Sequence, residues 1–353
     1  MGTDYSSVPI YDNTKTMKKS NLLFMGLIML AVMMSSFKKD DVVTIFMIGD
    51  STMANKNISN GNLERGWGMA LQCYFDDKIR VDNHAVNGRS SKSFINEGRW
   101  QVVLDKIKPG DYVFIQFGHN DEKPKADRHT EPGTTFDENL RKFVRETRDK
   151  GGIPVLFNSV VRRNFLKQIP QNDDDEALRN TTGPTNIKAS EEGDSLVDTH
   201  GAYIISPKNV AKEMGVVFVD ANKITHELEQ GLGREASKKL HMWFLSGEVP
   251  SIPKGRQDNT HYCIYGAHVV ASLLADATAK EIPALRKHVV HYDMSVAKNG
   301  IGNYLDLQSA VDSAPVGNKT TIQVFAGEWK KPDISKDKKI KIILREGAIW
   351  KKD

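Results

Sequence analysis

The chain has 353 residues, of which 39% are hydrophobic and 27% are charged, and this composition is typical of a folded globular protein. Its net charge is only +4, and no concentrated basic tract with interleaved aromatic residues occurs, which excludes the usual pattern of a nucleic-acid-binding protein. We therefore expect no nucleic acid partner. The length allows two domains, or one domain with an appendage.

A short apolar run near the N-terminus has the pattern of an export signal. Two lysines precede residues 22–34 and two serines follow them. This order describes a secretory signal peptide, and the run is short for a membrane span. We assign residues 1–36 to the signal region, with Met17 as an alternative start. The protein is expected to be exported, periplasmic or extracellular, without a stable membrane partner. An uncleaved anchor is the alternative, because no Ala-x-Ala site is present.

Five apolar segments alternate with stretches of helical spacing in residues 42–283. This alternation predicts a parallel sheet with helices on both faces. We expect a flavodoxin-like three-layer αβα sandwich with strand order 2-1-3-4-5, in which strand 1 is central. The strands are expected within 42–52 and at 80–84, 112–117, 153–161 and 216–220, and the last helix at 265–280.

Two further segments differ from this alternation. Residues 162–199 form a long polar excursion, which in a compact domain is functional or mobile. After about residue 283 the pattern changes to short strands at 320–325 and 339–344 with many lysines. We therefore place a boundary near residue 288, between a main domain (residues 42–283) and a tail (residues 289–353).

The two cysteines, Cys73 and Cys263, are too few for a disulfide framework or a zinc site. They form either one disulfide or two free thiols, and two free thiols is the simpler interpretation.

Four polar clusters lie at junctions where chemistry is expected. The carboxyl ends of parallel strands meet at one edge of a sheet, so the first three clusters should converge there. The last cluster is expected to open the final helix, with its two side chains pointing to one side. The clusters are Gly49-Asp50-Ser51, Asn87-Gly88-Arg89, Gly118-His119-Asn120-Asp121 and Asp258-x-x-His261.

The clusters supply the parts that a nucleophilic serine needs. A serine hydroxyl requires a base within hydrogen-bond reach, and His261 would be that base for Ser51. Asp258 would orient the imidazole and stabilise its charged form. The backbone N–H groups of Ser51 and Gly88 and the side-chain amide of Asn120 would bind an oxyanion. Each cluster alone also fits an ordinary turn or helix cap, and their occurrence together in order favours the catalytic interpretation.

The four clusters resemble those of the SGNH (GDSL-type) hydrolases, and within them the rhamnogalacturonan acetylesterases. The resemblance covers about residues 42–282 and implies the αβα sandwich, no metal and no cofactor, and Ser51, Asp258 and His261 in the roles described above. The long excursion departs from the compact members. The matching words are Ile48-Gly49-Asp50-Ser51-Thr52, the stretch from Asn87 to Trp100, Gly110-Asp111-Tyr112-Val113, Phe117-Gly118-His119-Asn120-Asp121, Asp258-Asn259-Thr260-His261 and Tyr265-Gly266-Ala267.

The tail resembles the opening of a pectin methylesterase, a family that folds as a right-handed parallel β-helix. The resemblance lies in residues 296–304, 307–315 and 321–329. That family's catalytic residues lie further along than this chain reaches, so we assign the tail no activity. Because β-helix coils need stacked neighbours to bury a core, we expect this truncated fragment to be poorly ordered.

Together these patterns predict an exported esterase that removes acetyl groups from acetylated pectic polysaccharide, namely rhamnogalacturonan, with water as co-substrate. Arg89 and Trp243 are candidate substrate contacts, although solvated surface explains Arg89 equally well and core packing is slightly favoured for Trp243. The alternatives are an acetylesterase acting on another polysaccharide such as xylan, and a non-catalytic pectin-binding protein. A lipid ester is less favoured, because charged residues flank the clusters.

Overall fold

The structure, a computed structural model, describes residues 42–165 and 193–352. The predicted signal region and most of the predicted excursion lie outside the described residues. From Val42 onward the chain forms one compact unit, so the boundary near residue 288 stays a prediction. Within the described part of the chain, no helix is both long enough and apolar enough to cross a membrane.

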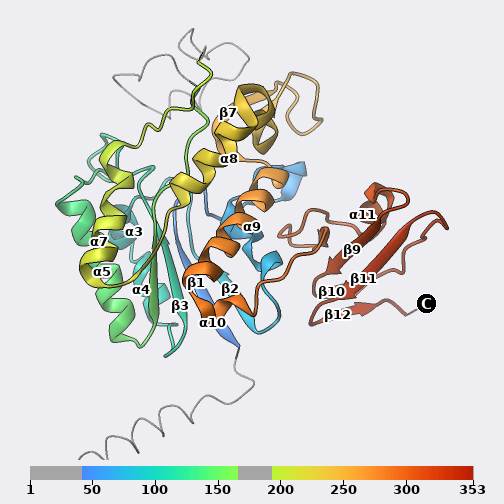
Figure 1. The fold of residues 1–353 in the computed structure, drawn as a ribbon, viewed down its shortest axis with the longest axis horizontal. Helices are drawn as coiled ribbons and strands as arrows, with labels where there is room; N and C mark the ends of the chain where they lie inside the picture. Colours follow the sequence, from blue (N-terminus) through green and yellow to red (C-terminus); the bar gives the residue numbers. More distant parts are fainter. Residues whose placement is uncertain (1–41, 166–192, 353) are drawn as a thin grey trace, which may run out of the picture. The chain divides into compact units, whose positions relative to one another are not determined.

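The central sheet has five parallel strands in the order β2-β1-β3-β4-β5, as predicted (Figure 1). Strand β1 pairs with β2 on one side and with β3 on the other, so it lies where the strand order reverses. In open α/β sheets this switch point, at the carboxyl ends of the strands, is where ligands bind. The strands are β1 Val43–Gly49, β2 Ile79–Asn83, β3 Tyr112–Gln116, β4 Ile153–Phe157 and β5 Val217–Val219.

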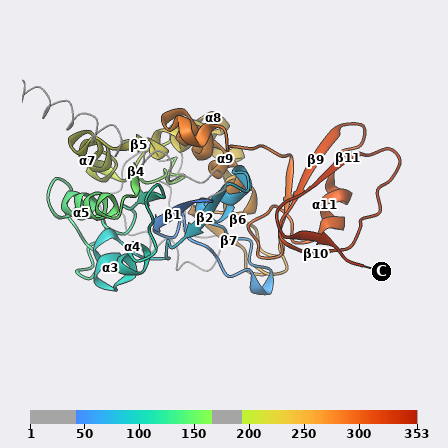
Figure 2. The same ribbon diagram turned by 90° about the horizontal axis from the view of Figure 1, so that it is seen from below.

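Helices cover both faces of the sheet (Figures 1 and 2). Side chains alternate along β1, so Ile45 and Met47 join one core and Phe46 and Ile48 join the other. The first core is closed mainly by α2, α8 and α9, and the second by α3, α4, α5 and α7. These helices are α2 Trp67–Ala70, α3 Ser91–Asn96, α4 Arg99–Leu104, α5 Thr135–Asp149, α7 Ser206–Met214, α8 Ala221–Ala236 and α9 Ile264–Glu281.

A β-hairpin precedes the last helix, where the sequence predicted only a loop and the start of that helix. Its strands are β6, His241–Phe244, and β7, Arg256–Tyr262, and they pair antiparallel. The register shifts between its paired residues, so that residues 258–261 bulge out opposite Met242. Asp258 and His261 therefore lie in a β-bulge, and the prediction that they open the helix is wrong.

The tail is folded, so the expectation that it is poorly ordered is wrong. Its strands pair in parallel, as predicted for a β-helix fragment, and they form two sheets. An apolar core of its own, which includes Val296, Ile322 and Trp329, lies among them. The elements are β8 Met294–Val296, α11 Leu307–Ser313, β9 Lys319–Val324, β10 Gly327–Trp329, β11 Lys339–Leu344 and β12 Ala348–Trp350.

Buried polar contacts join the tail to the main domain. Arg345 is 6% exposed and donates to the Phe75 carbonyl oxygen, to Asp77 and to Gln323. The Cys73 thiol donates to the Ile301 carbonyl oxygen, and both cysteines are free. The tail thus obtains from the main domain the neighbour that a short coil needs to bury its surface.

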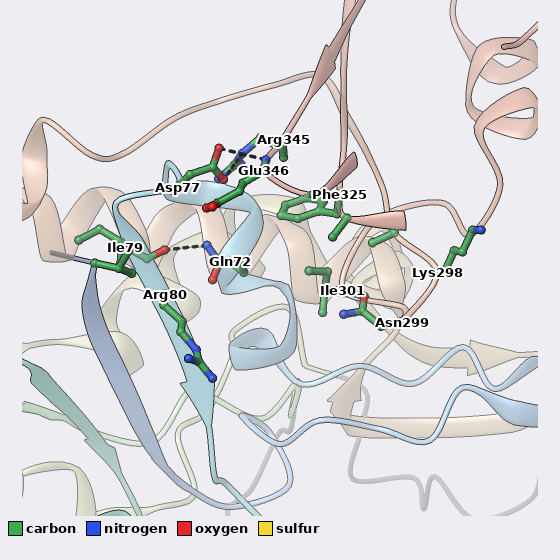
Figure 3. A pocket seen from close by; sticks show the side chains of 14 residues that line it. Gln72, Asp77, Ile79, Arg80, Lys298, Asn299, Ile301, Phe325, Arg345 and Glu346 are labelled. Carbon is green, nitrogen blue, oxygen red and sulfur yellow. Dashed lines mark hydrogen bonds and ion pairs between the residues drawn. The ribbon is translucent and has the colours of Figure 1, made fainter. Parts of the chain in front are cut away.

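A cavity of about 630 Å³ lies where the two parts meet. Gln72 and Arg80 line it from the main domain, and Lys298 and Phe325 line it from the tail (Figure 3). Neither Ser51 nor His261 is among its described lining residues. The cavity is therefore separate from the candidate active site.

Replacing the central residue of this contact should loosen the tail. In Arg345→Met, the buried acceptors around the guanidinium lose their donor, which should lower the free energy of unfolding by about 1 to 3 kcal/mol. Thermal unfolding measures the loss, and limited proteolysis should cut the tail faster than in the wild type. Lys341→Met, an exposed position on β11, is the matched control. A tail that is cut equally fast in wild type and Arg345→Met would contradict the prediction.

Candidate active site

Ser51 is presented by a tight turn directly after β1. The Asp50 carboxylate accepts hydrogen bonds from the Thr52 N–H and hydroxyl, at 2.9 and 2.8 Å. The Asp50 carbonyl oxygen accepts from the N–H groups of Met53 and Ala54. Gln116, the last residue of β3, donates to the Thr52 hydroxyl. Asp50 therefore shapes the turn that carries Ser51, in agreement with its absence from the predicted triad.

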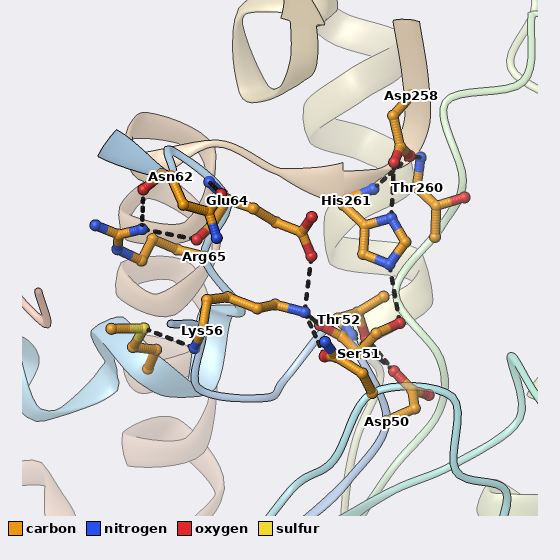
Figure 4. A network of polar contacts seen from close by, with 12 residues as sticks. Asp50, Ser51, Thr52, Lys56, Asn62, Glu64, Arg65, Asp258, Thr260 and His261 are labelled. Atoms are coloured by element: carbon orange, nitrogen blue, oxygen red, sulfur yellow. Dashed lines mark hydrogen bonds and ion pairs between the residues drawn. The ribbon is translucent and has the colours of Figure 1, made fainter. Parts of the chain in front are cut away.

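His261 lies between Ser51 and Asp258 (Figure 4). Its Nε2 is 2.9 Å from Ser51 Oγ, and its Nδ1 is 2.8 Å from Asp258 Oδ2. All three side chains are at least nine-tenths buried. This is the geometry in which an imidazole takes a proton from a serine while a carboxylate holds its tautomer.

The bulge in β7 lets Asp258 and His261 lie on one side of the strand. Asp258 Oδ1 accepts from the N–H groups of Thr260 and His261, at 2.8 and 2.9 Å, and so closes a turn around its own side chain. Burial by itself would raise the pKa of Asp258. The charges of His261 and Arg256, together with hydrogen bonds from His261, outweigh burial and hold that pKa well below its usual range. Asp258 is therefore ionised wherever the protein is folded near neutral pH.

The predicted oxyanion donors lie on two loops that are tied together. Asn120 Nδ2 donates to the Arg89 carbonyl oxygen at 3.2 Å, which joins the end of β3 to the loop of Gly88. Gly88 has φ +73°, a backbone conformation that favours glycine, and nothing lies within 4 Å of a Cβ added there. Among the described residues, no acceptor is seen for the N–H of Ser51 or of Gly88.

Asp121 fixes the same two loops relative to each other. Its carboxylate accepts from the N–H and hydroxyl of Ser91 at 3.0 and 2.5 Å, and from the Gly118 N–H at 3.1 Å. Thr130 adds a further donor at 3.0 Å. The two loops that carry Gly88 and Asn120 are therefore held by the buried carboxyl group of Asp121.

Three charged residues of the site were missed from the sequence. Lys56 Nζ lies 2.7 Å from the Ser51 carbonyl oxygen, 2.6 Å from Asn87 Oδ1 and 2.8 Å from Glu64 (Figure 4). Glu64 pairs with Arg256 at 2.7 Å. Lys56 and Glu64 lie in a loop without a recognisable motif. Arg256, two residues before Asp258, has the spacing of one strand face, but this segment was not predicted to be a strand.

The two candidate substrate contacts are both engaged within the protein. Arg89 Nε donates to Glu97 at 3.1 and 3.0 Å, and its guanidinium is about one-third exposed. Trp243 Nε1 donates to Asn259 Oδ1 in the bulge, and the Arg163 guanidinium lies 5.0 Å from the centre of its ring. These contacts favour the packing interpretation for Trp243, which supports the bulge. Substrate contact by either residue stays a prediction.

Comparison with known proteins identifies the family of this chain. The model of the GDSL-like Lipase/Acylhydrolase family matches residues 47–242. The "Rhamnogalacturonan acetylesterase RhgT" of Bacillus subtilis is 35% identical over 70% of this chain and 94% of its own length. The "Probable rhamnogalacturonan acetylesterase YesY" of the same organism is 32% identical, over 65% of this chain and 90% of its own length. The crystal structure of the B. subtilis protein YxiM aligns with a TM-score of 0.53 and 26% identity, over 69% of this chain and 58% of that one.

The fold and the arrangement of Ser51, His261 and Asp258 are those of a serine hydrolase. The chain belongs to the GDSL-like lipase/acylhydrolase family, and within it to the rhamnogalacturonan acetylesterase group that the resemblance predicted. It is an esterase.

The buried charges of the site should give stability that depends on pH. Burial would raise the pKa of Glu64, but the charges of His261, Lys56 and Arg256 lower it to about 2 from an ordinary 4.5. A lowered folded-state pKa contributes stability that is present above about pH 4.5 and is lost as the pH falls toward 2. The melting temperature of Glu64→Gln should therefore fall less steeply than that of the wild type over this range.

Glu213→Gln is the control for this measurement. Glu213 pairs with Arg141 at 2.8 Å, but its side chain is 55% exposed, so water screens the pair. Its curve of melting temperature against pH should run close to that of the wild type. Parallel curves for the wild type and Glu64→Gln would contradict the prediction.

Proposed function

We propose that this esterase removes acetyl groups from acetylated pectic polysaccharide through an acyl-enzyme on Ser51. The observation that carries the proposal is the continuous hydrogen-bonded line from Ser51 through His261 to Asp258, at 2.9 and 2.8 Å. A serine hydroxyl is a poor nucleophile alone, and a hydrogen-bonded imidazole is the usual activator.

The acylation step follows from these contacts. Ser51 Oγ attacks the acetyl carbonyl carbon while His261 Nε2 takes the hydroxyl proton. Asp258 stabilises the resulting imidazolium through Nδ1. The negative oxygen of the tetrahedral intermediate accepts hydrogen bonds from the N–H groups of Ser51 and Gly88 and from the second amide hydrogen of Asn120. When the intermediate collapses, the C–O bond to the sugar breaks, and His261 returns its proton to the departing sugar oxygen.

Deacylation repeats the same steps with water. His261 Nε2, oriented by Asp258 through Nδ1, takes a proton from a water molecule, whose oxygen attacks the acetyl carbon of the acyl-enzyme. Collapse of the second intermediate releases acetate, and His261 returns the proton to Ser51 Oγ. His261 passes the Ser51 proton to the sugar oxygen in the first half-reaction and a proton from water to Ser51 in the second, so the enzyme ends in its starting state and needs only water as co-substrate.

Rhamnogalacturonan is the polysaccharide that we propose as substrate. Two relatives that align over at least nine-tenths of their own length are named as rhamnogalacturonan acetylesterases. The pattern of residues 1–36 supports export, to the periplasm or beyond.

Ser51→Ala tests the mechanism. The substitution removes the nucleophile with little change in volume, so the release of product from a chromogenic acetyl ester should fall by at least about 1,000-fold. A stability close to that of the wild type serves as the control for folding. Equal rates in the two proteins would refute the acyl-enzyme mechanism and favour a non-catalytic binding protein.

The substrate is tested by comparing polymers. Acetate release from acetylated rhamnogalacturonan should exceed release from acetylated xylan, at equal acetyl concentration, because we expect the sugar backbone to be recognised as well as the ester. The measurement is kcat/KM for each polymer with the full chain, and the chromogenic ester serves as the reference for intact chemistry. Faster release from xylan would assign the enzyme to the other polysaccharide.

A further inference from the structure

A line of alternating charges runs behind the candidate triad. It begins at Lys56, continues through Glu64 and Arg256, and ends at Asp258. The successive N–O distances are 2.8, 2.7 and 2.6 Å. The Lys56 and Glu64 side chains are only 2% and 13% exposed, so water screens their charges weakly. We call these four residues the charge chain.

Arg256 and His261 share one oxygen of Asp258. Arg256 Nη2 lies 2.6 Å from Asp258 Oδ2, the same oxygen that accepts from His261 Nδ1. A guanidinium on that oxygen opposes the charge that Asp258 offers to an imidazolium. Unopposed, Arg256 would therefore make the proton transfer from Ser51 to His261 less favourable.

Glu64 compensates for this effect. It pairs with the Nη1 side of the Arg256 guanidinium, and its charge also interacts with that of His261. Lys56 in turn pairs with Glu64, so the four groups of the charge chain sum to zero. The imidazolium formed during the reaction then meets a charge chain of zero net charge rather than one that is net positive.

The other end of the charge chain reaches the nucleophile. Lys56 Nζ donates hydrogen bonds to the Ser51 carbonyl oxygen and to Asn87 Oδ1, and Asn87 precedes the candidate oxyanion donor Gly88. One ammonium group therefore links the turn of Ser51 to the loop of Gly88. The charge chain therefore ends at Asp258, which orients His261, and begins at Lys56, which contacts the loops of Ser51 and Gly88.

We propose that Glu64, Arg256 and Lys56 are positioning residues. They hold the triad and the Gly88 loop in fixed relative positions, and they keep the net charge of the charge chain next to His261 at zero. This inference rests on the proposed serine mechanism. It assigns a function to three residues outside the Ser51, His261 and Asp258 set, and it predicts an effect on the chemical step rather than on substrate binding.

Glu64→Gln is the first test. It leaves the charge chain with a net positive charge before the imidazolium forms, so kcat on a chromogenic acetyl ester should fall by about 10- to 100-fold. KM should change little, because the charge develops only in the transition state. Rates are divided by the number of active sites counted from the burst of acyl-enzyme formation, so unfolded protein does not affect kcat. Glu64→Asp keeps the charge and should retain more of kcat than Glu64→Gln.

The double variant Glu64→Gln/Arg256→Met separates charge balance from simple loss of packing. Removing the guanidinium together with the carboxylate returns the set to zero net charge, so kcat should be at least as high as in Glu64→Gln alone. A purely structural role predicts that the double variant is worse than either single one. Glu213→Gln, in the exposed pair with Arg141, should keep the wild-type kcat and KM.

Three results would overturn the inference. They are a wild-type kcat in Glu64→Gln, equal kcat values in Glu64→Asp and Glu64→Gln, and a double variant slower than Glu64→Gln. Ser51→Ala, measured alongside, distinguishes this failure from failure of the mechanism. If Ser51→Ala is inactive while Glu64→Gln is unchanged, only the charge chain is refuted. If Ser51→Ala is active, the serine mechanism itself is wrong.

Discussion

The bulge in strand β7 is the constraint on which the site depends. Residues three apart on a regular strand point to opposite faces, so Asp258 and His261 could not meet without it. The extra residues opposite Met242 let the chain turn around the Asp258 carboxylate, which accepts two N–H groups of its own loop. Arg163 and Trp243 then hold the bulge through Asn259 Oδ1. Neighbouring segments thus define the geometry that presents His261 to Ser51.

The site also shows how a buried carboxylate is kept charged. Asp258 is removed from water, which by itself favours its neutral form, and its contacts with His261 and Arg256 reverse that preference. Each added charge then requires its own partner, and Lys56 also donates to neutral acceptors on Ser51 and Asn87. Burying ions costs several kcal/mol each, which only dense pairing offsets. The loop of residues 56–64 therefore belongs to the site as much as the strand ends do.

The tail also contacts the loop that carries Lys56 and Glu64. Arg65, which follows Glu64, is buried and donates to the Gly300 carbonyl oxygen at 3.0 Å and to the Glu64 carbonyl oxygen at 2.8 Å. A short parallel coil buries too little apolar surface to be stable alone, and the main domain supplies the missing neighbour through Arg345 and Gln323. This mutual support explains why the tail is folded although the resemblance to a β-helix ends after the first coils.

Local patterns in the chain were enough to predict the parallel sheet, its order 2-1-3-4-5 and the convergence of the loops that carry Ser51, Gly88 and Asn120. Apolar strands and the polar motifs at their ends are short-range sequence signals, and the geometry of a parallel sheet brings the strand ends together. The fold alone decided the β7 bulge, the folded tail and the charge chain through Glu64 and Arg256. These features depend on pairing between distant segments, and neither the spacing of Asp258 and His261 nor the charge of a loop residue reveals which partner it will meet.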